Sequence, residues 1–266
     1  MKKILFMFIL LSLAAQVIGA NNNGLQYLPD NDLRFPVQGD NKSRLKSNST
    51  KQDYLNMMKR FKKMYDGEFR QADKKVKFVD KWRDDKVNAY IELRFTRTVK
   101  VRVFGGLARH PLLTRDGLAG VFCHEIGHII GGKPRHSGLL LTWASAEGQS
   151  DYFASLRCMR EYFQHDDNES IVQRLNVDPE VERQCKDNAL CKRISMASKS
   201  IIDMIVDVVE AEVVPEFDTP DMTVVEETIT GVYPSLQCRL DTFLSGALEA
   251  SRPSCWFKDA FPKNNF

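Results

Sequence analysis

The feature that most constrains the fold of this chain is a pair of histidines inside an otherwise apolar segment. Residues 119–132 read Ala-Gly-Val-Phe-Cys-His-Glu-Ile-Gly-His-Ile-Ile-Gly-Gly. His124 and His128 are four residues apart, so a helix of about 3.6 residues per turn places both rings on one face. Two imidazoles arranged in this way can bind the same Zn²⁺ ion. The segment therefore predicts a buried helix that ends at Gly131 and carries half of a metal site.

The acidic residue inside this motif predicts a chemical role. Glu125 follows the first histidine, so the helix turns its side chain away from the line that joins the two rings. In a His-Glu-x-x-His motif, a carboxylate at this position can take a proton from a water molecule that the metal activates. We therefore predict that Glu125 is a general base.

Two residues are candidates for a third metal ligand. Glu147 lies in a segment that predicts a helix from about residue 142 to 163, and Asp151 is one turn further along the same face. Glu147 can bind the metal while Asp151 accepts the second ring N–H of a histidine ligand. The alternative is His136, but the metzincin spacing requires a histidine at residue 134, which is proline here. The spacing therefore favours Glu147.

These residues resemble the motifs of the gluzincin metallopeptidases, in which H-E-x-x-H is followed by E-x-x-x-D. The resemblance implies that His124 and His128 are the imidazole ligands and that Glu125 is the general base. It also implies that Glu147 is the carboxylate ligand and that Asp151 is its partner in the site. The expected cofactor is Zn²⁺.

Two weaker matches point to the CAAX-prenyl-protease/HtpX-like branch of these enzymes. Asn88-Ala89-Tyr90 is similar to the Asn-Ala-aromatic strand that precedes the metal helix in that branch. Residues 231–240 resemble its His-Pro…Arg segment, except that Tyr233 stands where those proteins have histidine. A tyrosine can donate a hydrogen bond to a developing oxyanion, so Tyr233 is a second catalytic candidate. The alternative is that it is a plain turn residue before proline.

The N-terminus and the charge of the chain indicate its compartment and exclude one class of partner. Residues 1–20 have two lysines, then an apolar run, and end in Gly-Ala, which predicts a secretory signal peptide. The uncharged stretch is shorter than the roughly 20 residues that span a bilayer, so we expect cleavage and no stable membrane insertion. Cleavage would remove two lysines from a net charge of +3. A nearly neutral, secreted or periplasmic protein is not expected to bind nucleic acid.

The cysteines support export. All six lie beyond residue 20, and an even number in an exported chain predicts three disulfides. Six cysteines allow 15 pairings, and the sequence does not choose among them. The residues concerned are Cys123, Cys158, Cys185, Cys191, Cys238 and Cys255.

The rest of the chain predicts an α+β, zincin-like fold. Residues 21–50 are polar and predict a flexible leader, whereas residues 51–266 predict one metallopeptidase domain. Apolar residues at helical spacing predict a helix over 50–66, and alternation within 74–105 predicts a small antiparallel sheet packed on the metal-binding helix. The free edge of its last strands could hold an extended peptide beside the metal, or the strands could be purely structural. A further amphipathic helix is expected over 195–209, within a largely helical C-terminal part.

The function that these patterns favour is an exported zinc metallopeptidase, with a protein or peptide as its substrate. Peptide bonds would be hydrolysed by a metal-activated water molecule with Glu125 as the base. One alternative is a zinc-dependent cell-wall amidase. Another is a non-catalytic, disulfide-stapled envelope protein. Structural zinc sites normally have four protein ligands, and the sequence offers only three, which favours catalysis.

Overall fold

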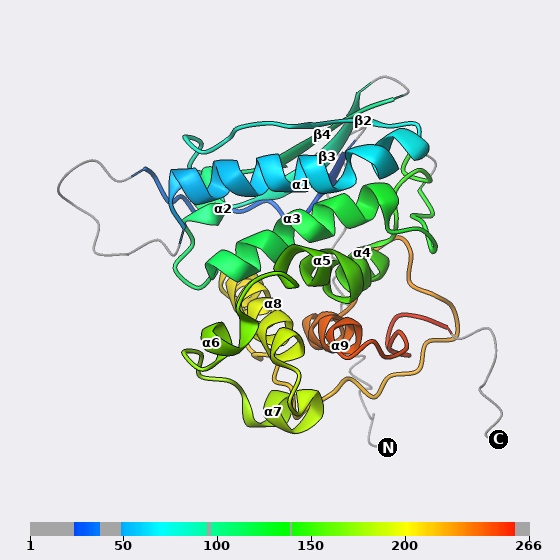
Figure 1. Cartoon of the computed structure of the whole chain (residues 1–266). Helices are drawn as coiled ribbons and strands as arrows, with labels where there is room; N and C mark the ends of the chain where they lie inside the picture. The colour runs from blue at the N-terminus through cyan, green and yellow to red at the C-terminus, as the bar shows by residue number, and fades with distance from the viewer. Residues whose placement is uncertain (1–23, 38–48, 95–96, 139, 259–266) are drawn as a thin grey trace, which may run out of the picture.

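The computed structural model describes residues 24–37, 49–94, 97–138 and 140–258 (Figure 1). The predicted signal peptide, residues 1–20, lies outside the described residues. The strands are β1 (Gly24–Gln26), β2 (Lys75–Phe78), β3 (Ala89–Arg94) and β4 (Thr98–Val103). The α-helices are α1 (Lys51–Gln71), α2 (Gly105–Ala108), α3 (Arg115–Ile130), α4 (Glu147–Phe153), α5 (Met159–Phe163), α6 (Asn168–Val172), α7 (Pro179–Cys185), α8 (Ala189–Val209) and α9 (Leu236–Ala247).

The strands form one sheet in the order β1-β3-β4-β2. β3 pairs antiparallel with both β1 and β4, whereas β2 pairs parallel with β4. The alternation that predicted strands also explains their burial, because every second residue of β3 and β4 faces the core. The buried positions include Ala89, Ile91, Val99 and Val101. Alternation did not predict the parallel pairing of β2 with β4. It arises because the chain after β2 crosses the sheet before it enters β3.

Helix α3 lies at the centre of the molecule (Figure 1). It contacts β3 and β4 on one side, α1 beside them, and α4 and α8 on the other side. Residues 117–129 of α3 are all buried, as expected for a helix without a charged outer face. Thr114 caps its first turn by accepting the Gly117 N–H at 2.9 Å, and the helix ends before Gly131 as predicted.

The helix expected over 142–163 begins later and is built from three pieces. α4 starts at Glu147, a π-helical stretch covers Ala154–Cys158, and α5 follows. The residues before Glu147 are not helical because Ser145 donates its N–H to the His128 carbonyl at 2.9 Å. Ser145 also forms a β-bridge with Arg135. These contacts hold Ser145 and Ala146 in extended backbone just before α4, and the residues before them form a turn.

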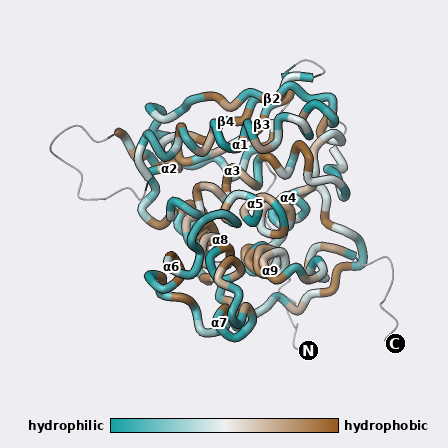
Figure 2. Tube along the Cα trace, viewed as in Figure 1, coloured by the Kyte–Doolittle hydropathy of each residue, from teal (hydrophilic) through white to brown (hydrophobic). Residues whose placement is uncertain are grey.

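Apolar side chains of the helices form much of the hydrophobic core. Figure 2 shows that hydrophobic residues concentrate along α8 and α9, whereas the peripheral helix α7 is mostly hydrophilic. Helix α8 begins at Ala189, earlier than the predicted residue 195, because Asn188 caps it by accepting the Cys191 N–H at 2.9 Å. Within the described part of the chain, no helix is long and apolar enough to cross a membrane.

The six cysteines pair as three disulfides. Cys123–Cys158 joins α3 to the π-helical stretch, Cys185–Cys191 joins α7 to α8, and Cys238–Cys255 joins α9 to the segment that follows it. Spacing along the chain left the pairing open. The packing of α3 against the helix after α4 decides the first of these pairs, since its two cysteines are 35 residues apart.

The segment 24–37 differs from the flexible leader that composition predicted. Its first residues form β1 on the edge of β3, so that edge is not free. Leu25, Tyr27 and Leu28 are each 1% exposed. The average composition of residues 21–50 is polar, and it hides this short apolar run. Strand pairing satisfies the backbone of the run, and burial of its three side chains supplies the stabilisation.

Candidate metal centre

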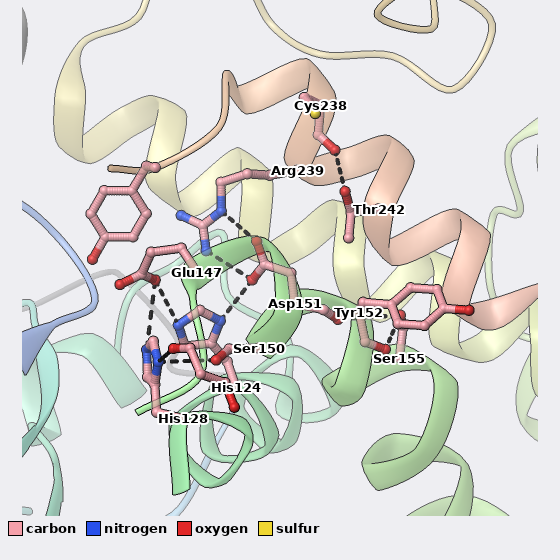
Figure 3. A network of polar contacts seen from close by, with 12 residues as sticks. His124, His128, Glu147, Ser150, Asp151, Tyr152, Ser155, Cys238, Arg239 and Thr242 are labelled. Atoms are coloured by element: carbon pink, nitrogen blue, oxygen red, sulfur yellow. Dashed lines mark hydrogen bonds and ion pairs between the residues drawn. The ribbon is translucent and has the colours of Figure 1, made fainter. Parts of the chain in front are cut away.

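Three side chains converge between α3 and α4 (Figure 3). His124 and His128 project from α3, and Glu147 is the first residue of α4. The Oε2 atom of Glu147 lies 3.2 Å from His124 Nε2 and 3.6 Å from His128 Nε2. The ligand-type atoms of the three residues all lie within 4.8 Å of one another. The structure therefore brings together the three residues that the sequence predicted as ligands.

Each histidine ring is held by its other nitrogen. His124 Nδ1 lies 2.7 Å from an oxygen of Asp151, and His128 Nδ1 lies 2.8 Å from the Ser145 carbonyl oxygen. A carbonyl oxygen can only accept, so His128 donates from Nδ1 and keeps the lone pair of Nε2 free. The carboxylate of Asp151 favours the same tautomer of His124. When both rings are neutral, as metal binding requires, their Nε2 lone pairs face the centre.

The buried polar atoms at this point fit a metal ion. His124 Nε2 and both oxygens of Glu147 have no hydrogen-bond partner among the residues that the structure describes. Buried polar atoms are almost always satisfied, so three such atoms facing one another indicate a missing partner. Two imidazole nitrogens and one carboxylate oxygen form the ligand set of a catalytic zinc site. The set therefore fits Zn²⁺.

A close approach of α3 and α4 makes this geometry possible. Gly127 lies between the two histidines, and a Cβ atom built there would be 2.9 Å from Ser150 Cα. Any larger residue would push the helices apart and withdraw Glu147 from the rings. Ser150 also places its hydroxyl 3.0 Å from His128 Nδ1.

Sequence reasoning did not assign a role to Arg239, which completes the centre. Its Nε and Nη2 atoms donate to the two oxygens of Asp151 at 2.7 and 2.9 Å (Figure 3). Both side chains are buried. Burial alone would raise the pKa of Asp151, but Arg239 and then His124 hold it below its usual range. The sequence offered one signal for this role, which is an arginine inside a largely apolar helical segment. A charged side chain is almost never buried without a partner, so this pattern indicates a buried ion pair.

In the metal-free centre, burial and neighbouring charges shift the pKa of each ionisable side chain. Burial raises the pKa of Glu125 to about 8 and lowers that of His128 to about 3. Burial also opposes the charged form of His124, but the Asp151 carboxylate raises its pKa to about 9. Burial acts to raise the pKa of Glu147, yet the histidines, His128 first, hold it well below its usual range. In the metal-free centre, Glu147 is therefore ionised, whereas burial favours the neutral form of Glu125.

Glu125 lies on α3 directly after His124. Its side chain is buried on α3, and neither of its oxygens has a hydrogen-bond partner in the described ranges. Its charge is coupled to those of His124 and Glu147. Among the described residues, no protein group thus engages this carboxyl group, and His124 of the candidate ligand group precedes it in α3.

The two remaining candidates lie next to the centre. The Tyr233 hydroxyl donates to the carbonyl oxygen of Gln26, and burial raises its pKa well above the usual range. His136, the alternative third ligand, is buried with Nε2 3.5 Å from Glu147 Oε1. It is not part of the mutually close ligand group. His136 thus faces one oxygen of Glu147, while the other oxygen faces His124 and His128.

Comparison with known proteins agrees with this geometry. Residues 51–173, from α1 through α6, match the family described as Peptidase family M48. Peptidases of this family are zinc-dependent metallopeptidases. No curated protein and no solved structure matches the chain significantly. The match to the M48 peptidases covers residues 51–173, and by this match and by its His124–His128–Glu147 group the chain is a zinc metallopeptidase.

Proposed function

We propose that this chain is an exported metallopeptidase that hydrolyses peptide bonds with Glu125 as its general base. The observation that carries the proposal is the buried, unpartnered carboxyl group of Glu125 beside the three ligand-type side chains, as far as the described residues extend. The M48 match supports peptide bonds, rather than cell-wall amides, as the substrate class.

Each side chain of the centre has a part in this proposal. His124, His128 and Glu147 bind zinc, and Asp151 fixes the ring of His124. The bound ion supplies Lewis-acid chemistry, polarising a carbonyl group and lowering the pKa of water. Glu125 takes a proton from the attacking water and returns it to the leaving amine. Burial raises the pKa of Glu125, which favours the protonated form that the carboxyl group reaches after it has taken the proton.

Tyr233 is proposed to stabilise the substrate carbonyl oxygen as negative charge develops on it. Its hydroxyl donates to a peptide carbonyl, that of Gln26, and its ionisation is influenced by the charges of Glu147 and Glu125, which supports a position near the centre. A preorganised donor aimed at a developing charge contributes most in a site that excludes water. Tyr233→Phe would then lower kcat while leaving zinc content unchanged.

The general base is tested by Glu125→Gln, which keeps the size of the side chain and removes its basicity. We expect zinc content to be unchanged and kcat/KM on a casein-type substrate to fall by about 10²–10⁴-fold. Glu227→Gln, on an exposed loop, is the matched control and should retain activity. Hydrolysis by Glu125→Gln at the wild-type rate would disprove the proposed mechanism. Peptidoglycan assayed in parallel tests the amidase alternative.

Export is the second part of the proposal. The apolar N-terminal segment and three disulfides support it, because structural disulfides persist in oxidising compartments. N-terminal sequencing of the mature protein from the extracellular or periplasmic fraction should begin at Asn21. A mature protein that still begins at Met1 and sediments with membranes would contradict it.

A further inference from the structure

The edge of β3 that faces away from β4 is covered by the chain's own residues Gly24–Leu28. Tyr27 donates its backbone N–H to the Ala89 carbonyl at 2.8 Å. The side-chain amide of Asn88 accepts the Leu28 N–H at 3.2 Å and donates to the Leu28 carbonyl at 3.1 Å. All of these bonds use main-chain groups of the covering segment. Strand addition binds extended peptides in the same way, with little dependence on their sequence.

Two residues of the covering segment reach the metal centre. The ring of Tyr27 packs edge-on against His124, with ring centroids 4.7 Å apart. Its hydroxyl is buried and has no hydrogen-bond partner within the described part of the chain. Gln26 supplies the carbonyl oxygen that accepts from Tyr233. The segment therefore occupies the position, and makes the carbonyl contact, that an extended substrate would need.

The covering segment closes the centre to polypeptides. His124, Glu125, His128 and Glu147 are each no more than 1% exposed. A scissile peptide bond must come within about 3–3.5 Å of the attacking atom. Because β1 already pairs with β3 and Tyr27 packs against His124, a substrate backbone cannot pair with this edge while the segment stays in place. Hydrolysis of a polypeptide then requires the segment to move.

We propose that Gly24–Leu28 is an intramolecular occupant of a peptide-binding site on the edge of β3, and that this site accepts an extended polypeptide only after the segment has left. The inference rests on the proposed peptidase function. β1 is only three residues long, so its release breaks few backbone hydrogen bonds, and it must also expose the buried side chains of Leu25, Tyr27 and Leu28. Further along the chain, the Phe35 carbonyl accepts from Arg109 Nε at 2.8 Å. The segment can therefore leave β3 while the residues that follow it remain anchored to the domain.

A disulfide that locks β1 onto β3 tests this proposal. Gln26 lies opposite Tyr90 in the antiparallel register. Because Tyr27 bonds to Ala89, the pair 26–90 is a non-hydrogen-bonded pair, with Cα atoms about 4.5 Å apart, within the range that a disulfide spans. The full-length, zinc-loaded chain carrying Gln26→Cys and Tyr90→Cys is compared, without reductant, with its matched control carrying Gln26→Ser and Tyr90→Ser. Mass spectrometry verifies the added bond.

Two readouts separate this inference from the proposed function. We expect the locked variant to cleave a casein-type substrate at least about 100-fold more slowly than the serine control. We also expect dipicolinate to remove its zinc at least about tenfold more slowly. Equal rates of zinc removal and cleavage in the two variants would overturn the proposal and make β1 a permanent strand. If neither variant cleaves peptides, the proposed function fails, and the rate of zinc removal still decides whether the segment closes the centre.

Discussion

The buried pair between Arg239 and Asp151 gives the most quantitative prediction about this protein. Arg239→Met removes the guanidinium group and keeps most of the apolar length of the side chain. Two charge-assisted bonds of 2.7 and 2.9 Å are lost, and the Asp151 carboxylate stays buried. Removing one partner of a buried ion pair costs about 3–5 kcal/mol, mainly because the other charge is left uncompensated.

The structure places the expected cost near the lower end of that range. His124 remains 2.7 Å from Asp151, and its pKa of about 9 in the metal-free protein keeps it charged at neutral pH. We therefore expect the free energy of unfolding of the metal-free protein to fall by about 3 kcal/mol. Adding Asp151→Asn removes the stranded charge, so the double variant should regain at least about 1 kcal/mol relative to Arg239→Met.

Urea unfolding at neutral pH, with the disulfides intact, measures these changes as shifts in the midpoint at constant slope. Arg70→Met is the matched control, because Arg70 pairs with Asp66 on the surface with 73% of its side chain exposed. Exposed pairs contribute about 0–1 kcal/mol, so the control should change little. A loss below about 1 kcal/mol for Arg239→Met, or strict additivity in the double variant, would refute the reasoning.

Three further results are expected. Glu147→Ala should lose zinc on dialysis while His136→Ala retains it, and the opposite pattern would make His136 the third ligand. Asp151→Asn should lower zinc affinity by about 10–100-fold in a chelator competition, because a ligand ring loses its acceptor; unchanged affinity would contradict that role. Burial lowers the pKa of His110 below its ordinary 6.5, so the unfolded chain takes up this proton first and the contribution of His110 to stability falls as pH drops through and below 6.5. His110→Gln should flatten this pH dependence of the urea midpoint, and an equal slope would exclude His110 as its source.

The metal centre was largely readable from the sequence because its ligands come from regular elements with fixed spacing. Four residues separate His124 from His128, and helical geometry alone places their rings on one face. Four residues also separate Glu147 from Asp151, although the helix that carries them begins later than its apolar pattern indicated. The proximity of Glu147 to the rings required α3 and α4 to pack, and Gly127 permits that approach.

Contacts between segments far apart in the chain escaped prediction for one physical reason. Arg239 lies 88 residues from Asp151, and no local periodicity relates them. The leader was expected to be flexible because its average composition is polar. Its strand β1 becomes ordered only because the distant edge of β3 supplies backbone partners. Averaging over a window cannot detect an element that another element stabilises.

The sequence by itself therefore determined which groups the centre contains: two imidazoles, a glutamate between them and a later carboxylate, set by the helical repeat. Only the tertiary structure decided how that centre is held and covered. The pairing of the cysteines, the support of Asp151 by Arg239 and the placement of Tyr27 against His124 each join residues that are distant in the chain. Such contacts depend on how the helices and the sheet pack, because local spacing fixes directions within one element and not distances between elements.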